Sequence, residues 1–129
     1  MKFIQEDYKS SYILLNQVKV LEQEKESWNI SIRILSVMNQ IELENYELAD
    51  TLTENLRKHI ERVKKTLPVG KRDEKIVQIL TALSRHSYHF RRTFRVKAEA
   101  FSLLESLEKE YRWKILSPEM IIFHEWFKA

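Results

Sequence analysis

The residues best suited to chemistry or recognition lie in one basic and aromatic stretch, RHSYHFRRTFRVK, at residues 85–97. No acidic residue occurs between Glu74 and Glu99. The cations of the stretch are Arg85, Arg91, Arg92, Arg95 and Lys97, and its aromatic residues are Tyr88, Phe90 and Phe94. Arginine side chains neutralise backbone phosphates, and exposed aromatic rings stack on bases. The stretch is therefore a candidate nucleic-acid or phosphate-binding surface, and a solvated helix junction is the alternative.

Two observations weigh against the phosphate-binding interpretation. The formal net charge is only +3, which is small for a chain that holds a polyanion. Phe90 and Phe94 also fall, with Phe101, on the apolar stripe of a helix, so we expect these rings to anchor the core. A second basic cluster from Arg57 to Lys75 would favour phosphate binding if it lay nearby. We therefore favour a protein partner over nucleic acid.

A run of acidic residues precedes the basic stretch, with no basic residue between its members. The run consists of Glu42, Glu44, Glu47, Asp50 and Glu54. Helical spacing places Glu47, Asp50 and Glu54 on one face, and a catalytic pair there would need burial to separate the two pKa values. We expect a solvated acidic face that selects a partner's charge and orientation together with the basic stretch.

Metal and nucleophile chemistry lack the residues that they need. His86 and His89 are three apart, a spacing that metal sites use, but we expect both to be solvated or hydrogen-bonded. None of the four histidines lies in a Glu-x-x-His motif, and the chain has no cysteine, no Gly-x-Ser-x-Gly elbow and no glycine-rich phosphate loop. We expect His124 to pack or to cap a helix. The sequence predicts a protein without catalytic, metal or cofactor sites.

The composition favours a single helical domain over residues 1–129. The chain has 129 residues, 43% of them hydrophobic and 32% charged, which suits a soluble domain with its own core. One glycine and two prolines provide very few of the positive-φ positions that hairpin turns use, which argues against a β-rich fold. The longest uninterrupted aliphatic run near the start covers only Ile13 to Leu15, so we expect a cytoplasmic protein without a membrane partner.

Apolar residues recur at steps of three and four along most of the chain, which predicts six helices. The predicted helices cover about 3–23, 27–43, 45–67, 73–89, 94–111 and 118 onward. Residues 22–26, four of them charged, mark the first break, and Pro68 with Gly70 ends the third helix. One helix over 73–112 is the alternative to two with a turn near 89–94. The predicted N-caps are Ser27, Asn45, Asp73 and Ser117.

Short links between these helices predict consecutive antiparallel hairpins, three in series. The segment ELENYELADTLTENLRKHIERVKK, residues 42–65, resembles the link and second helix of a tetratricopeptide-like repeat, with Tyr46 after the turn and the small Ala49 three positions on. Together with the closing segment PEMIIFHEWFKA, the chain resembles the C-terminal helical-hairpin region of large tetratricopeptide-like proteins of Bacteroidetes bacteria. This resemblance implies a right-handed solenoid or α-α superhelix that serves as a non-enzymatic scaffold.

Protein recognition is the function that the pattern favours. The expected partner is a protein or peptide, with a homo-oligomer as a further alternative. Tryptophan is enriched in interface hot spots. Trp113 stands between Arg112 and Lys114 at the polar end of a predicted helix, so we expect it to be exposed and to contact a partner. Trp28 and Trp126 are expected to fill the core or to join hairpins.

Overall fold

The fold is described by a computed structural model for residues 2–106, 111 and 122–128, and the side chains for residue 17 and from residue 21 on. The described residues form helices and no strand, which confirms the all-α prediction. The helices are α1 (Lys2–Glu42), α2 (Tyr46–Val63), α3 (Lys71–Arg85), α4 (Phe90–Val96), α5 (Ala98–Glu105) and α6 (Phe123–Lys128). Their arrangement as a tetratricopeptide-like solenoid stays a prediction.

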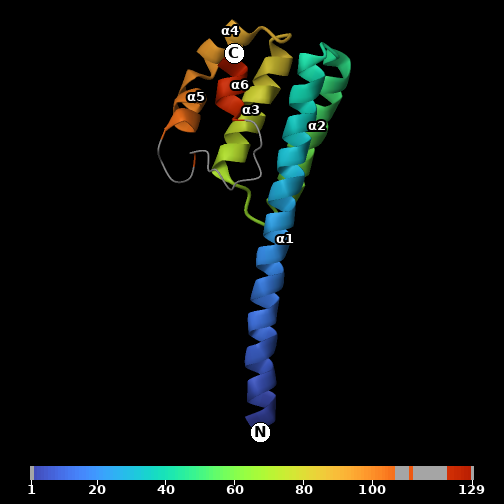
Figure 1. Cartoon of the computed structure of the whole chain (residues 1–129), viewed down its shortest axis with the longest axis vertical. Helices are drawn as coiled ribbons and strands as arrows, with labels where there is room; N and C mark the ends of the chain where they lie inside the picture. The colour runs from blue at the N-terminus through green and yellow to red at the C-terminus, as the bar shows by residue number, and fades with distance from the viewer. Residues whose placement is uncertain (1, 107–110, 112–121, 129) are drawn as a thin grey trace.

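Helix α1 is continuous over 41 residues, so the predicted break at residues 22–26 is wrong. Glutamate, glutamine and lysine are good helix formers, and neither glycine nor proline interrupts the segment. Glu26 instead contacts His59 of α2 through its carboxylate, and Asn29 Nδ2 donates to that carboxylate at 3.2 Å. The first predicted hairpin is therefore absent, and the N-terminal half of α1 projects from the other helices as a single rod (Figure 1).

Helices α1 and α2 form an antiparallel hairpin through a left-handed turn at Glu44. Glu44 has a φ of 57°, and the N–H of Asn45 donates to the carbonyl of Gln40 at 2.9 Å, which closes the end of α1. Asn45 occupies the predicted N-cap position of α2, but its side chain makes no capping hydrogen bond. The backbone bonds at the end of α1 therefore define this turn.

The link from α2 to α3 differs from the prediction at both ends. Helix α2 ends at Val63 and not at Leu67, and the amide of Leu67 closes a final turn by donating to the Val63 carbonyl at 2.8 Å. Gly70 is the N-cap of α3 with a φ of −58°, a conformation open to any residue. Asp73, the predicted cap, lies inside the first turn of α3, where the helix dipole stabilises a carboxylate.

Residues 71–105 are broken twice, which excludes the single long helix. Helix α3 ends at Arg85, and the turn covers 86–89, earlier than the predicted 89–94. Ser87 and Tyr88 have φ values of 51° and 61°, and the Tyr88 amide donates to the Leu83 carbonyl at 2.8 Å. A second break at Lys97 separates α4 from α5, which ends at Glu105. Trp113 and the predicted start at Ser117 and Pro118 lie outside the described residues.

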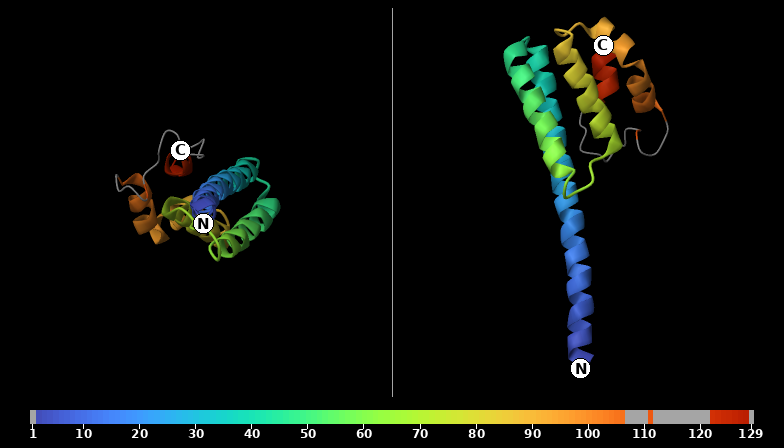
Figure 2. Two further views of the ribbon diagram at one scale, coloured as in Figure 1. Left: turned by 90° about the horizontal axis from the view of Figure 1, so that it is seen from below. Right: turned by 180° about the vertical axis from the view of Figure 1, so that it is seen from behind.

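The core forms where the C-terminal half of α1 meets the other helices. Helix α3 contacts α1, α2, α4 and α5, and Figure 2 shows it within the bundle beside α1 and α2. The most deeply buried side chains include Ile30, Val37, Leu56, Ile76, Ile79, Leu80, Leu83, Phe101, Leu104 and Phe123. None of the described helices is both long enough and apolar enough to cross a bilayer.

The predictions for five aromatic residues have different outcomes. Phe101 is 1% exposed, which confirms it as a core anchor. Phe94 is 38% exposed and Trp28 is 46% exposed, so the prediction that these two side chains fill the core is wrong. Phe90 and Trp126 are partly buried against the core. The exposed Phe94 belongs to the groove described next, and the exposed Trp28 belongs to the outer face of α1.

Candidate partner-binding groove

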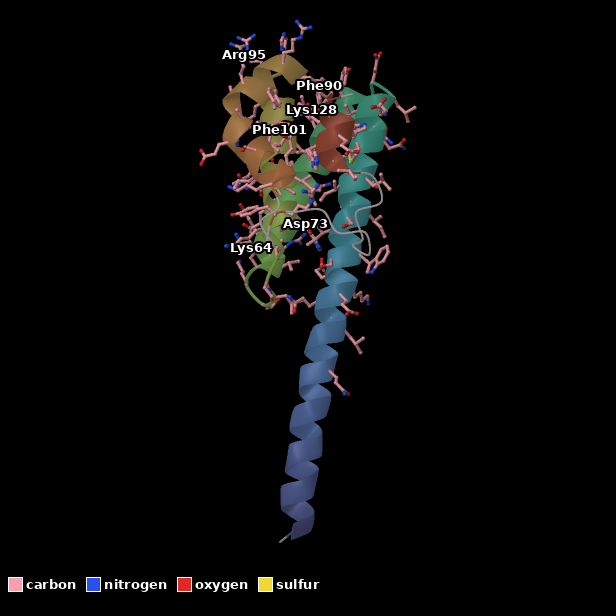
Figure 3. The ribbon with its side chains drawn as sticks, turned by 60° about the vertical axis from the view of Figure 1, so that its left-hand side comes forward. Lys64, Asp73, Phe90, Arg95, Phe101 and Lys128 are labelled. Carbon is pink, nitrogen blue, oxygen red and sulfur yellow. The ribbon has the colours of Figure 1, made fainter. Side chains whose placement is uncertain are left out.

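The basic stretch forms the end of the bundle around α4. Arg85 is the last residue of α3, α4 carries Arg91, Arg92 and Arg95, and all four are exposed. Lys97 joins α4 to α5 and is half-buried. Figure 3 shows Arg95 at the outer edge of the molecule beside α4. Within the described part of the chain, no ion pair engages these four arginines. Their charges are therefore available to a partner.

Tyr88 attaches the turn before α4 to the start of α2. Its ring stacks on Tyr46 with 4.3 Å between centroids, and its hydroxyl donates to Asp50 Oδ1. Ser84 Oγ donates to the same oxygen at 2.5 Å. Burial first, and then the hydrogen bond to Asp50, raises the pKa of the Tyr88 hydroxyl above the ordinary tyrosine value of about 10. The acidic and basic segments of the sequence thus meet at this contact.

The contact makes stability sensitive to alkaline pH. Because folding raises the pKa of Tyr88, its contribution is fully present below about pH 10, the unfolded pKa, and is lost as the pH rises further. We expect Tyr88→Phe to lower the free energy of unfolding by about 1 kcal/mol at pH 7, the usual value of one hydrogen bond. Urea unfolding from pH 7 to 11 should show this difference shrinking above pH 10, and a difference that widens there would contradict the assignment.

The three acidic residues predicted to share one face have different environments. Asp50 accepts the two hydrogen bonds from Tyr88 and Ser84. Glu54 pairs with Arg57 at 2.6 Å, and this hydrogen bond lowers the pKa of the Glu54 carboxyl. Glu47 is exposed and has no ion pair among the described side chains. The structure therefore does not bring the three together as one free acidic surface.

A groove of about 860 Å³ lies between the α1–α2 turn, α4 and α6. Its aromatic lining consists of Tyr46, Phe90, Phe94, Trp126 and Phe127, its acidic lining of Glu42 and Glu44, and its basic lining of Arg91, Arg95 and Lys128. We call this the charged groove. Trp126 Nε1 donates to Glu42 at 2.7 Å, which fastens α6 to the end of α1. Lys128 contacts Glu105 and lies 5.5 Å from the centre of the Phe94 ring.

Part of the charged groove was predicted from the sequence. Arg91 and Arg95 belong to the predicted basic stretch, and Glu42 and Glu44 belong to the predicted acidic run, whereas Trp126 was expected to fill the core or to join hairpins. Trp126 reaches the groove because α6 folds back onto the end of α1, a long-range contact with no local signature. The available signal was the density of aromatic residues in α6, where Phe123, Trp126 and Phe127 lie within five positions.

A second depression, of about 660 Å³, lies between α1 and α2. Its lining consists of Arg33, Asn55, Lys58, Glu61, Arg62 and Lys65. It contains part of the predicted second basic cluster, but Lys64 and Arg95 lie at opposite ends of the bundle in Figure 3. Arg57 and Lys64 are paired with acidic residues, and Arg72 is only 8% exposed. The two basic clusters therefore do not form one continuous surface.

The histidines cap helices or contact polar side chains. His89 is the N-cap of α4, and its Nδ1 accepts a hydrogen bond from the Arg92 amide at 3.1 Å. His86 is the C-cap of α3, and His124 Nδ1 lies 3.2 Å from a guanidinium nitrogen of Arg72. Across the described ranges, no three His, Asp or Glu side chains come together as metal ligands would.

Comparison of the chain with protein-family models, with curated proteins and with solved structures gives no match. The class of the protein thus follows from its own architecture. It is an all-α protein with a long projecting helix and an aromatic groove whose lining carries charges of both signs.

Proposed function

We propose that this chain is a non-enzymatic recognition module whose charged groove binds a short segment of a partner protein. The observation that carries the proposal is the presence of unpaired arginines and of glutamates around one aromatic floor. A complementary segment places an acidic side chain toward Arg91 and Arg95 and a basic side chain toward Glu44. An apolar side chain between them contacts Phe90 and Phe94. Opposed charges of this kind select the direction in which the segment binds.

The same lining disfavours nucleic acid. A phosphate backbone that reached Arg91 and Arg95 would also meet the carboxylates of Glu42 and Glu44, which repel it. Tyr46 is stacked on Tyr88, and Lys128 lies over the Phe94 ring, so one face of each of these lining rings is already covered. A protein segment, which carries charges of both signs, fits this lining better than a uniformly charged polymer.

The packing of α1 and α2 supports a scaffold of the tetratricopeptide-like type. Ala49 is fully buried where α2 contacts its neighbours, which is the role that the resemblance implies for a small residue at this place. Tyr46, the aromatic residue after the turn, stacks on Tyr88 and so joins α2 to the next hairpin. These two contacts support family membership as part of the proposal.

Selection from a random dodecapeptide phage library tests the groove. Peptides enriched on the native protein should carry acidic and basic residues on either side of an apolar residue. We expect the double variant Arg91→Glu/Arg95→Glu to weaken binding of a selected peptide by about tenfold or more, because each exposed charge contact contributes up to about 1 kcal/mol and the reversal adds repulsion. Fluorescence anisotropy with labelled peptide measures the change.

Arg92→Glu is the matched control, because Arg92 is an exposed arginine of the same helix that does not line the groove. It should leave peptide affinity unchanged, and a peptide with its acidic residues replaced by lysine should recover affinity for the double variant. Equal losses in the control and the double variant would contradict the proposal. So would binding to a thymidine oligonucleotide that weakens roughly 50-fold between 50 and 200 mM salt, as four phosphate contacts predict.

A further inference from the structure

The outer face of α1 carries an apolar stripe that no described helix covers. Leu21, Trp28 and Ile32 are 63%, 46% and 54% exposed. At about 100° per residue they lie roughly half a turn from the buried Ile30 and Ile34. Adding residues from the sequence at alternating steps of four and three gives the series Leu14, Val18, Leu21, Lys25, Trp28, Ile32, Leu35 and Asn39. We call this series the outer seam.

From the outer seam we infer that two copies of this chain pair through α1 as an antiparallel coiled coil. Steps of four and three repeat every seven residues, an average of 3.5, and this period keeps one seam facing a partner helix. A second helix is therefore the occupant that fits the spacing. The N-terminal half of α1 projects clear of the bundle in two opposite views, so it can lie along another molecule (Figures 1 and 2).

Lys25 decides the orientation of the pair. In a parallel coiled coil each seam position meets its own copy, so Lys25 would face a second Lys25 within the apolar seam. In an antiparallel pair centred between residues 25 and 28, Lys25 lies opposite Trp28 of the second copy, and its ammonium contacts the exposed indole face. The same register places Leu21 opposite Ile32, so these two exposed aliphatic side chains meet each other and the one cation of the seam meets an aromatic ring.

The length of the outer seam suits a stable dimer. Pairing from residue 14 to residue 39 gives about 39 Å of contact at 1.5 Å per residue. The four heptad positions nearest a partner cover about four sevenths, or roughly 20 Å, of the ~35 Å circumference of a helix with its side chains. The contact length multiplied by the contact width is close to the roughly 800 Å² that each partner buries in a stable complex. The seam is thus large enough without further surface.

Sedimentation of the full chain over a range of concentrations tests the pairing. We expect a dimer in the native protein, and we expect Leu21→Lys and Ile32→Lys each to raise its dissociation constant at least about 100-fold, because symmetry places every substitution in the interface twice. Val96→Lys, at a valine of α4 that is 60% exposed, is the control and should not change it. Circular dichroism establishes that each variant stays folded. A native protein that remains monomeric at several hundred micromolar overturns the inference.

Single cysteines test the antiparallel register, because the chain contains no thiol of its own. A mixture of the Leu21→Cys and Ile32→Cys proteins should form the crossed disulfide on mild oxidation, because the two positions face each other. Leu21→Cys alone should not crosslink, since its two copies lie about 16 Å apart along the axis, beyond disulfide reach. Crosslinking of Leu21→Cys with itself overturns the antiparallel pairing. The groove variants Arg91→Glu and Arg95→Glu should leave dimerisation unchanged. The test of the outer seam is therefore independent of the test of the charged groove.

Discussion

Replacing Phe127 with alanine is expected to lower the free energy of unfolding by about 4 kcal/mol, the usual cost of removing a buried phenylalanine. Phe127 is 4% exposed, and its ring centre lies 4.8 Å from that of Phe90 and 4.7 Å from that of Phe101. It therefore joins α6 to both α4 and α5. Helix α6 has six residues, too few to be stable as an isolated helix, so its position depends on this packing.

Urea denaturation followed by circular dichroism measures the loss, and Phe94→Ala is the matched control. Phe94 is 38% exposed, so we expect its removal to cost no more than about 1.5 kcal/mol, although its ring contacts Phe101. Phe127→Ala should also weaken peptide binding in the charged groove, because Trp126 and Lys128 belong to the same short helix. A loss at Phe127 no larger than that at Phe94 would show that α6 is not held by this aromatic cluster.

Replacing Arg72 with methionine is expected to lower the free energy of unfolding by about 3 kcal/mol. Arg72 is 8% exposed, and its guanidinium donates to the carbonyl oxygens of Leu104 at 2.9 Å and Tyr111 at 2.8 Å. Hydrogen bonds from a charged group contribute about 1.5 to 3 kcal/mol each, and the substitution leaves two carbonyls without this donor. Methionine retains most of the apolar stem, so the loss measures the polar contacts.

Two companion variants separate the hydrogen bonds from the charge. Arg72→Lys keeps the charge but lacks the planar fork that reaches several acceptors, so it should recover only part of the stability. Arg92→Met removes an exposed arginine and should change the free energy of unfolding by less than about 0.5 kcal/mol. If Arg72→Met were as mild as Arg92→Met, the buried guanidinium would not join the start of α3 to the end of α5.

These two residues explain why the C-terminal part of the chain could not be assigned in detail from its sequence. Arg72 falls in a run of basic residues, where the pattern indicates a solvated cation, yet it is buried by contacts with residues more than thirty positions away. Phe127 follows a helical stripe, but nothing in the local spacing shows that it packs on α4 and α5. Burial of a charged group and docking of a short helix both depend on partners that are distant in the sequence.

The breaks between helices also could not be predicted correctly from the local sequence. At residues 22–26 the charged residues indicated a break, but they are good helix formers, and Glu26 contacts His59 of α2 from inside a continuous α1. At residues 86–89 no glycine indicated a turn, yet Ser87 and Tyr88 adopt left-handed conformations that cost roughly 1–2 kcal/mol each. The contacts of Tyr88 with Tyr46 and Asp50 offset this cost.

The sequence by itself determined the all-α class and most of the buried stripes, including Ile34, Leu56, Ile79, Leu80, Leu83 and Phe101. Apolar spacing and the near absence of glycine are local properties, and a helix needs only local hydrogen bonds to form. Only the tertiary structure decided which breaks are real, and it alone brought Glu42 and Trp126 to the same groove as Arg91 and Arg95. The physical reason is that turn strain, charge burial and the meeting of distant side chains are fixed by packing energies, which a single segment does not contain.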